Sequence, residues 1–144
     1  MAITKTPITT ELAQKNKVQT KILSSNVTSD GTVSDLTFNN LKTGKLYSYI
    51  LQTTTEHAGT DPGSFINVLH NGNIEASIEN RDDDTSVNQT HSKTAVATFV
   101  ASASQVTVET NGFGDGITLE GSGSKALTFE QLIEWNDLEE TTEF

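Results

Sequence analysis

Short runs in which apolar and polar residues alternate, each closed by Gly, Asn or Asp, fill the chain from Val18 to Leu119. A period of two places alternate side chains on the two faces of a β-strand. Runs of strand length separated by turn residues are typical of an all-β sandwich or barrel. The chain shows no alternation of strands with helices of the kind that builds a parallel sheet. The sequence therefore predicts an antiparallel all-β fold.

The strongest local signal is an Asn-Gly pair between two strand-like runs. Asn71-Gly72 separates residues 64–70 from residues 73–80, and this pair favours a type I′ hairpin turn because both central positions need a positive φ. In the second run the alternation predicts that Ile74, Ala76 and Ile78 face inward. The expected strands cover residues 17–24, 33–41, 46–53, 64–70, 73–80, 94–101, 104–110 and 117–119.

Two other segments have local signals of turn or helix formation. The Thr43-Gly44 turn predicts that residues 33–41 and 46–53 form a second hairpin. Near the C-terminus, Thr128 followed by Gln131 fits a capping box and predicts a short helix over residues 129–136, whereas a strand over residues 126–132 is the equal alternative.

Residues 1–16 show no sustained period, and we interpret them as an extended N-terminal arm. Residues 17–144 are expected to form one domain. Long connections between about eight strands favour an antiparallel jelly-roll-like β-sandwich over a meander barrel. Only 33% of the residues are hydrophobic and 6% are aromatic, so the core is lean and neighbouring subunits are expected to contribute burial.

The net charge and its distribution along the chain limit the classes of molecule that the protein is expected to bind. The net charge is −10, and residues 51–144 carry three bases against 16 acids, whereas residues 1–50 carry six Lys against three acids. Nucleic acid is not expected as a partner, because phosphate contacts need clustered Lys or Arg and the chain has a single Arg, Arg81. No apolar run is long enough for a signal peptide or a bilayer span, so we expect a soluble protein, made in a cytoplasm, without a membrane partner.

Motifs for catalysis are missing from the sequence. The chain has no Cys, and its three His residues lie in or beside expected loops, where surface histidines are the ordinary interpretation. Asp82, Asp83 and Asp84 could offer oxygen ligands to Ca²⁺, but the spaced ligands of a calcium loop are missing, so a solvated acidic loop is preferred. We therefore predict no catalytic residue, no cofactor and no metal site.

Aromatic residues suggest contact surfaces instead. Tyr47 and Tyr49 share one face of a strand; they are expected in the core, and an exposed pair would be able to stack on sugar rings. Phe113, among glycines in a loop, and Trp135, near the acidic tail, are expected to be exposed contacts.

Two short sequence motifs are similar to motifs in a known group of proteins. LTFNNL at residues 36–41 with Gly44 and Tyr47, and LTFEQL at residues 127–132 followed by EETTEF at residues 139–144, resemble small virion proteins of tailed bacteriophages. That resemblance implies a non-enzymatic β-sandwich of the virion. No catalytic residue comes with it.

Within that class the resemblance implies a capsid cement or decoration protein, because the chain is short and begins with an arm. Such proteins bind the outside of the shell, often as trimers, so the expected partners are the major capsid protein and further copies of this chain. The expected location is the capsid surface, after synthesis in the cytoplasm of a bacterial host. The expected capsid or subunit contacts are Ile3, Pro7, Ile8, Leu12, Phe113, Trp135 and Phe144. The alternatives are a receptor-binding domain of a tail fibre and a carbohydrate-binding sandwich, each with a glycan as its partner.

Overall fold

The computed structural model describes residues 16–57, 63–80, 89–113, 116–121 and 128–135. The described part is all-β, as predicted, and no helix in it is long and apolar enough to cross a membrane. Its strands are β1 (Lys17–Ile22), β2 (Gly31–Phe38), β3 (Leu46–His57), β4 (Ser64–His70), β5 (Asn73–Asn80), β6 (Gln89–Val100), β7 (Val106–Asn111), β8 (Ile117–Leu119) and β9 (Phe129–Glu134).

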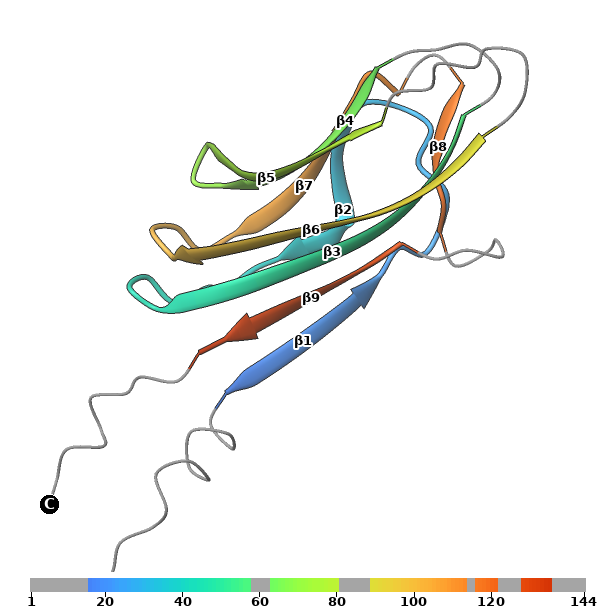
Figure 1. The fold of residues 1–144 in the computed structure, drawn as a ribbon. Coiled ribbons are helices and arrows are strands. Elements are labelled where there is room, and N and C mark those ends of the chain that lie inside the picture. Colours follow the sequence, from blue (N-terminus) through green and yellow to red (C-terminus); the bar gives the residue numbers. More distant parts are fainter. Residues whose placement is uncertain (1–15, 58–62, 81–88, 114–115, 122–127, 136–144) are drawn as a thin grey trace, which may run out of the picture.

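These strands form two antiparallel sheets that pack as a sandwich (Figure 1). The first sheet has the order β1-β9-β3-β6, with the short β8 also paired to β3, and the second has the order β2-β7-β4-β5. The chain passes repeatedly from one sheet to the other, and among the described strands only β4 and β5 are consecutive neighbours within a sheet. This arrangement confirms the predicted jelly-roll-like sandwich.

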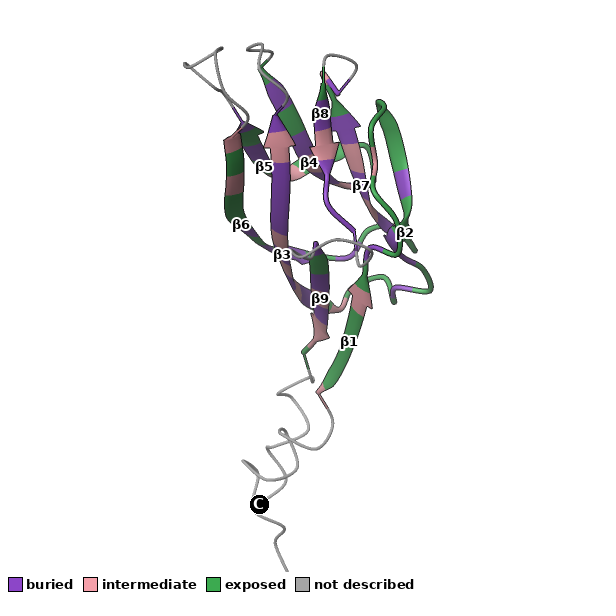
Figure 2. Ribbon diagram, turned by 90° about the vertical axis from the view of Figure 1, so that its right-hand side faces the viewer, coloured by how far each residue is buried: buried purple, intermediate pink, exposed green. Residues whose placement is uncertain are grey.

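The core lies between the two sheets and is filled from alternate positions of each strand. In β3 the odd-numbered residues from Tyr47 to His57 face inward and are buried, and in β4 the inward residues are Ile66 and Val68. Figure 2 shows β3 largely buried, whereas β1 and β6 carry long exposed stretches. Tyr47 and Tyr49 are 2% and 0% exposed, so the prediction that they belong to the core is confirmed.

The predicted Asn-Gly hairpin is present. β4 and β5 pair through a tight turn in which Asn71 has a φ of 49° and Gly72 a φ of 78°. Ile78 is buried and Ala76 half-buried, but the expectation for Ile74 is wrong, because its side chain is 60% exposed. The register shifts between Val68 and Leu69, and this irregularity turns Ile74 to the outer face.

The second expected hairpin is wrong. β2 pairs with β7, whereas β3 pairs with β6, β8 and β9 in the other sheet. The tight turn at Gly44 does exist, with a φ of 89°, but the N–H of Gly44 donates to the carbonyl of Ala101 and that of Leu41 to the carbonyl of Ser104. These bonds fasten the turn to the β6–β7 connection, so the chain crosses between sheets there.

The C-terminal segment is a strand, and the alternative of a helix over residues 129–136 is wrong. β9 lies between β1 and β3 and pairs with both. Its pairing with two neighbours outweighs the local capping signal at Thr128, whose hydroxyl instead accepts the backbone N–H of Thr54. The expected arm, residues 1–16, lies outside the described residues except for Asn16.

Candidate functional site

Of the residues predicted to make capsid or subunit contacts, the structure describes only Phe113 and Trp135. Ile3, Pro7, Ile8, Leu12 and Phe144 lie outside the described residues. The structure therefore leaves their proposed role as a prediction.

Trp135, at the end of β9, is 39% exposed, so its ring is available on the surface. Phe113 is 1% exposed, so the expectation of an exposed contact there is wrong. Its backbone N–H donates to Asp30 Oδ1 over 2.7 Å, and the Thr110 hydroxyl nearby donates to the carbonyl of Ser29 over 2.9 Å. These bonds fold the segment after β7 against the β1–β2 connection and bury the ring.

Trp135 lies at one end of the outer side of the β1-β9-β3-β6 sheet. Because neighbours in register share a face, the strand pairing defines which side chains point outward there. The outer apolar face is the part of this surface formed by four successive rows across the sheet: Trp135, Leu46 and Val100; Val18, Ile133, Ser48 and Thr98; Thr20, Gln131, Ile50 and Val96; and Ile22, Phe129, Gln52 and Thr94. Beyond it the same side of β3 continues with Thr54 and then Glu56.

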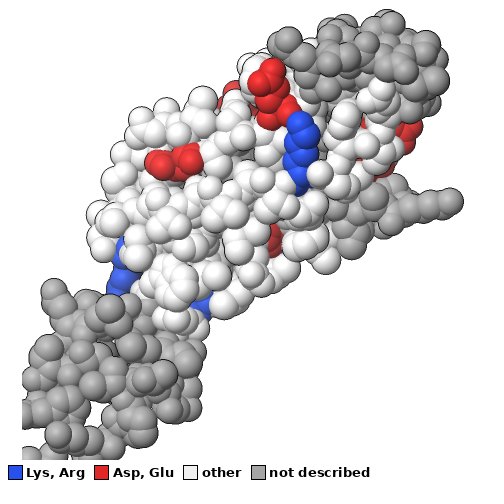
Figure 3. All heavy atoms as spheres, in the orientation of Figure 1, with Lys and Arg blue, Asp and Glu red and all other residues white. Residues whose placement is uncertain are grey.

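None of the positions in these four rows holds a charged residue, although the chain has nine basic and 19 acidic residues. Val96 and Val100 are 62% and 58% exposed, and Val18 is 56% exposed. The outer side of the second sheet differs, because there Glu109 and Glu79 lie on either side of β4. Seen from the side of Figure 1, Lys, Arg, Asp and Glu form separate patches on a mostly uncharged surface (Figure 3).

β1 shows how unusual this face is for a sandwich. Its apolar residues Val18 and Ile22 point to solvent, whereas its inward side carries Gln19 and Lys21. An ordinary half-buried strand has the opposite polarity, with the apolar set toward the core. The sequence of β1 is therefore suited to burial on its outer side.

Polar contacts hold the rim of this face around Trp135. The indole Nε1–H of Trp135 donates to Ser48 Oγ over 2.8 Å, which lays the ring over the neighbouring row. On the inward side, the Tyr47 hydroxyl donates to Glu134 Oε1 over 2.9 Å and accepts the N–H of Lys42 over 2.8 Å. Burial raises the pKa of Tyr47, so this phenol stays protonated and keeps its role as a donor.

The histidines do not follow the sequence expectation. His57 and His70 are 0% and 3% exposed, and His91 is half-buried, so the expectation of surface histidines is wrong for the first two. His70 is held by two bonds of 2.9 Å, one between Nδ1 and the carbonyl of Gln105 and one from the N–H of Ser102 to Nε2. The sequence prediction missed their burial because His57 lies in a segment expected to be a loop and His70 is the last residue of an expected strand, beside a turn.

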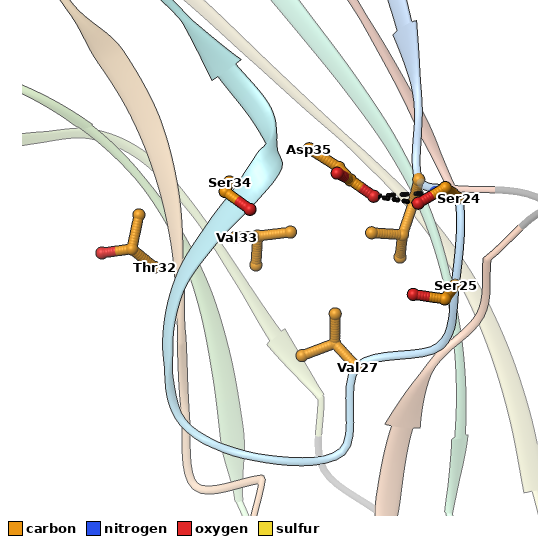
Figure 4. A pocket seen from close by; sticks show the side chains of 8 residues that line it. Ser24, Ser25, Val27, Thr32, Val33, Ser34 and Asp35 are labelled. Atoms are coloured by element: carbon orange, nitrogen blue, oxygen red, sulfur yellow. Dashed lines mark hydrogen bonds between the residues drawn. The ribbon is translucent and has the colours of Figure 1, made fainter.

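A shallow hollow of about 260 Å³ lies between the β1–β2 connection and β2 (Figure 4). Hydroxyl groups dominate its polar lining, and Asp35 contributes the carboxylate. Both the N–H and the hydroxyl of Ser24 donate to Asp35 Oδ2, and these bonds lower the pKa of Asp35. The carboxylate thus serves to fasten the connection to β2. The lining residues are Leu23, Ser24, Ser25, Val27, Thr32, Val33, Ser34 and Asp35.

Groups of three or more His, Asp or Glu side chains that could hold a metal ion are not found among the described residues. The calcium candidate at Asp82 to Asp84 lies outside them. Of the features described, the outer apolar face is the one that presents a broad and coherent surface, and it is the candidate functional site.

Comparison with known proteins gives no family. No protein-family model matches the chain, and no curated protein matches it either. Among solved structures, dimeric latent PorU from Porphyromonas gingivalis is similar at 11% identity, with a TM-score of 0.48, over 85% of this chain and 13% of that one. The C-terminal domain of EclA, described as a sugar-binding protein, is similar at 11% identity, with a TM-score of 0.41, over 90% of this chain and 82% of that one.

The VP2 subviral particle of infectious bursal disease virus is also similar, at 11% identity and a TM-score of 0.26, over 89% of this chain and 43% of that one. These likenesses concern the arrangement of strands alone. The function is therefore argued from the residues of this chain.

Proposed function

We propose that this chain is a non-enzymatic structural protein of a bacteriophage virion, a decoration protein that binds the outside of the capsid and bridges capsomers. In this proposal the outer apolar face makes the contact with the shell. The partners are the major capsid protein and further copies of this chain, arranged as a homotrimer. The location is the capsid surface.

The observation that carries the proposal is the absence of charge from the outer apolar face. Contiguous exposed apolar patches mark interaction sites, and the centre of an interface is depleted of charged residues. A chain of net charge −10 that keeps four successive rows of one sheet face uncharged has a surface suited to burial against another protein.

The positions of the chain ends support the same interpretation. Lys17, where β1 begins, pairs in register with Glu134, where β9 ends, so the chain enters and leaves the sandwich side by side (Figure 1). The described residues Asn16 and Trp135 therefore lie at the same end of the outer apolar face. In the proposal the apolar residues Ile3, Ile8 and Leu12 add contacts to the shell beyond those of the face.

The burial of Tyr47 and Tyr49 weakens the alternative of a glycan-binding protein. An exposed row formed by Tyr47 and Tyr49 was the feature that would support stacking on sugars, and both rings are buried. The outer apolar face has aromatic residues at Phe129 and Trp135, and the Trp135 indole N–H is already engaged with Ser48.

Quantitative mass spectrometry of purified particles tests the proposal. We expect the copy number of this chain to be close to that of the major capsid protein, because a decoration protein repeats with the shell lattice. A few copies per particle would contradict the capsid role and indicate the tail, and absence from the particle would contradict a virion role altogether.

A further inference from the structure

A buried and a half-buried histidine from neighbouring strands meet at one end of the sandwich. His57 is the last residue of β3, and both of its ring nitrogens are buried; His91, near the start of β6, is half-buried with Nε2 buried. In the β3–β6 register His91 is opposite Thr55, so both rings point inward on adjacent strands. Their ring centroids are 5.0 Å apart with an interplanar angle of 65°.

Other buried polar groups gather at the same end. Ser64 begins β4 and Asn80 ends β5, the two are opposite each other in register, and both are 0% exposed. Thr55 on β3 is also fully buried. Within the described part of the chain, Thr55 Oγ1, Ser64 Oγ, both amide atoms of Asn80 and His91 Nε2 have no hydrogen-bond partner. Buried polar atoms in folded proteins are nearly always paired, so a cluster of them calls for a polar ligand.

We propose that His57 and His91 bind a divalent transition-metal ion, with Zn²⁺ as the best match. Imidazole nitrogens are preferred ligands of Zn²⁺, Cu²⁺ and Ni²⁺. Two imidazoles bound to one tetrahedral Zn²⁺ at its usual bond length have ring centroids roughly 5 Å apart. The separation of the two rings therefore needs no large rearrangement of the strands. The neutral oxygens of Thr55, Ser64 and Asn80 are suited to complete the coordination or to accept hydrogen bonds from metal-bound water.

His70 provides a control within the same chain. It is also buried, and its Nδ1 and Nε2 bond to the backbone of Gln105 and Ser102. A metal ion cannot reach His70 without breaking one of these bonds, so His70 should stay unaffected where His57 and His91 respond. The site is independent of the proposed role in the virion.

The test titrates the chelator-treated full chain with ZnCl₂ and follows the imidazole nitrogens by two-dimensional NMR. We expect the signals of His57 and His91 to shift together and to saturate, while those of His70 stay in place. Unchanged His57 and His91 signals at millimolar Zn²⁺, or shifts at His70 alone, would overturn the proposal.

Thermal unfolding supplies a second readout. Zn²⁺ should raise Tm by several degrees, and EDTA should reverse the rise, because a ligand of the folded state stabilises it. His91→Gln should abolish the rise, and this half-buried position is suited to the substitution. A rise in His91→Gln equal to that of the unchanged chain would assign Zn²⁺ to another part of the molecule and overturn the proposal.

Discussion

At the scale of single residues, Glu130 is a carboxyl group buried in the core. Its side chain points inward from β9, is 0% exposed, and neither carboxyl oxygen has a hydrogen-bond partner among the described residues. Burial raises the pKa of Glu130 to about 9, although the positive charge of Lys21, its neighbour in register on β1, acts in the opposite direction. The folded protein therefore holds Glu130 as the neutral acid at pH 7.

This raised pKa makes stability depend on pH. Above the ordinary pKa of 4.5 the unfolded chain loses the Glu130 proton, whereas the folded protein keeps it. The free energy of unfolding is therefore highest below pH 4.5 and falls as the pH rises toward 9. Between pH 4.5 and pH 7 the loss is about 3 kcal/mol, from the free energy of one pKa unit. Glu130→Gln should remove this loss, because the amide does not ionise.

Urea unfolding of both proteins from pH 4.5 to 9 measures the effect. The stability of Glu130→Gln relative to the unchanged chain should rise steadily with pH across this range. A constant difference between the two proteins would show that the pKa of Glu130 is the same in the folded and unfolded states. Glu109→Gln, on the outer side of the second sheet, is the matched substitution outside the core.

Two glycines give a second prediction at this scale. Gly72 needs its positive φ but has open space around it, so Gly72→Ala should cost about 1–2 kcal/mol from backbone strain. At Gly121 a Cβ would lie 2.6 Å from the Ser25 carbonyl carbon, and the N–H of Gly121 donates to Asn26 Oδ1. Gly121→Ala must therefore displace backbone and should cost about 3 kcal/mol. Urea midpoints of the two variants measure this order, and a larger loss for Gly72→Ala would contradict it.

At the scale of elements, alternation in the sequence found the strands but not their partners. The Asn71-Gly72 hairpin was predictable because a two-residue turn dictates which strands pair. The turn at Gly44 dictates only that the chain reverses, and bonds to Ala101 and Ser104 carry the next strand into the other sheet. Those contacts join residues far apart in the sequence, so no local pattern reports them.

Local patterns were also insufficient to orient the strands. The run that contains Val18 and Ile22 has two unlike faces, but alternation does not say which face meets the core. The structure places the apolar side of β1 outward, and on its inward side Lys21 is opposite the buried Glu130 of β9. The same limit hid the outer apolar face, since it is assembled from four strands that are distant in the chain.

The exposed apolar side chains of β1 give a separate testable prediction. If its outer side is buried against a partner, replacing Val18 and Ile22 by Thr should weaken that contact and leave the fold intact, because both side chains are at least half exposed in the isolated chain. Thr keeps the β-branch that favours a strand. We expect unchanged Tm for the isolated protein and reduced binding to shells in sedimentation assays. A large fall in Tm would show that these residues stabilise the sandwich itself.

At the scale of the whole molecule, the two sheets have different outer surfaces. One presents apolar and uncharged polar side chains in four successive rows, with Glu56 beyond them, and the other carries Glu79 and Glu109. The fold needs only the inner faces of both sheets for its core, so the composition of the first outer face is not explained by folding. In our account it is explained by attachment to a shell, with the acidic remainder of the surface facing solvent.

The most direct measurement of this account is the occupancy of undecorated shells by a variant with charge on the outer apolar face. Val18→Lys with Val96→Lys places two charges on exposed positions of this face, and Ile74→Lys places one on an equally exposed position of the second sheet. We predict that the double variant folds but no longer co-sediments with shells, whereas Ile74→Lys binds at normal occupancy. Normal occupancy by the double variant would contradict the account.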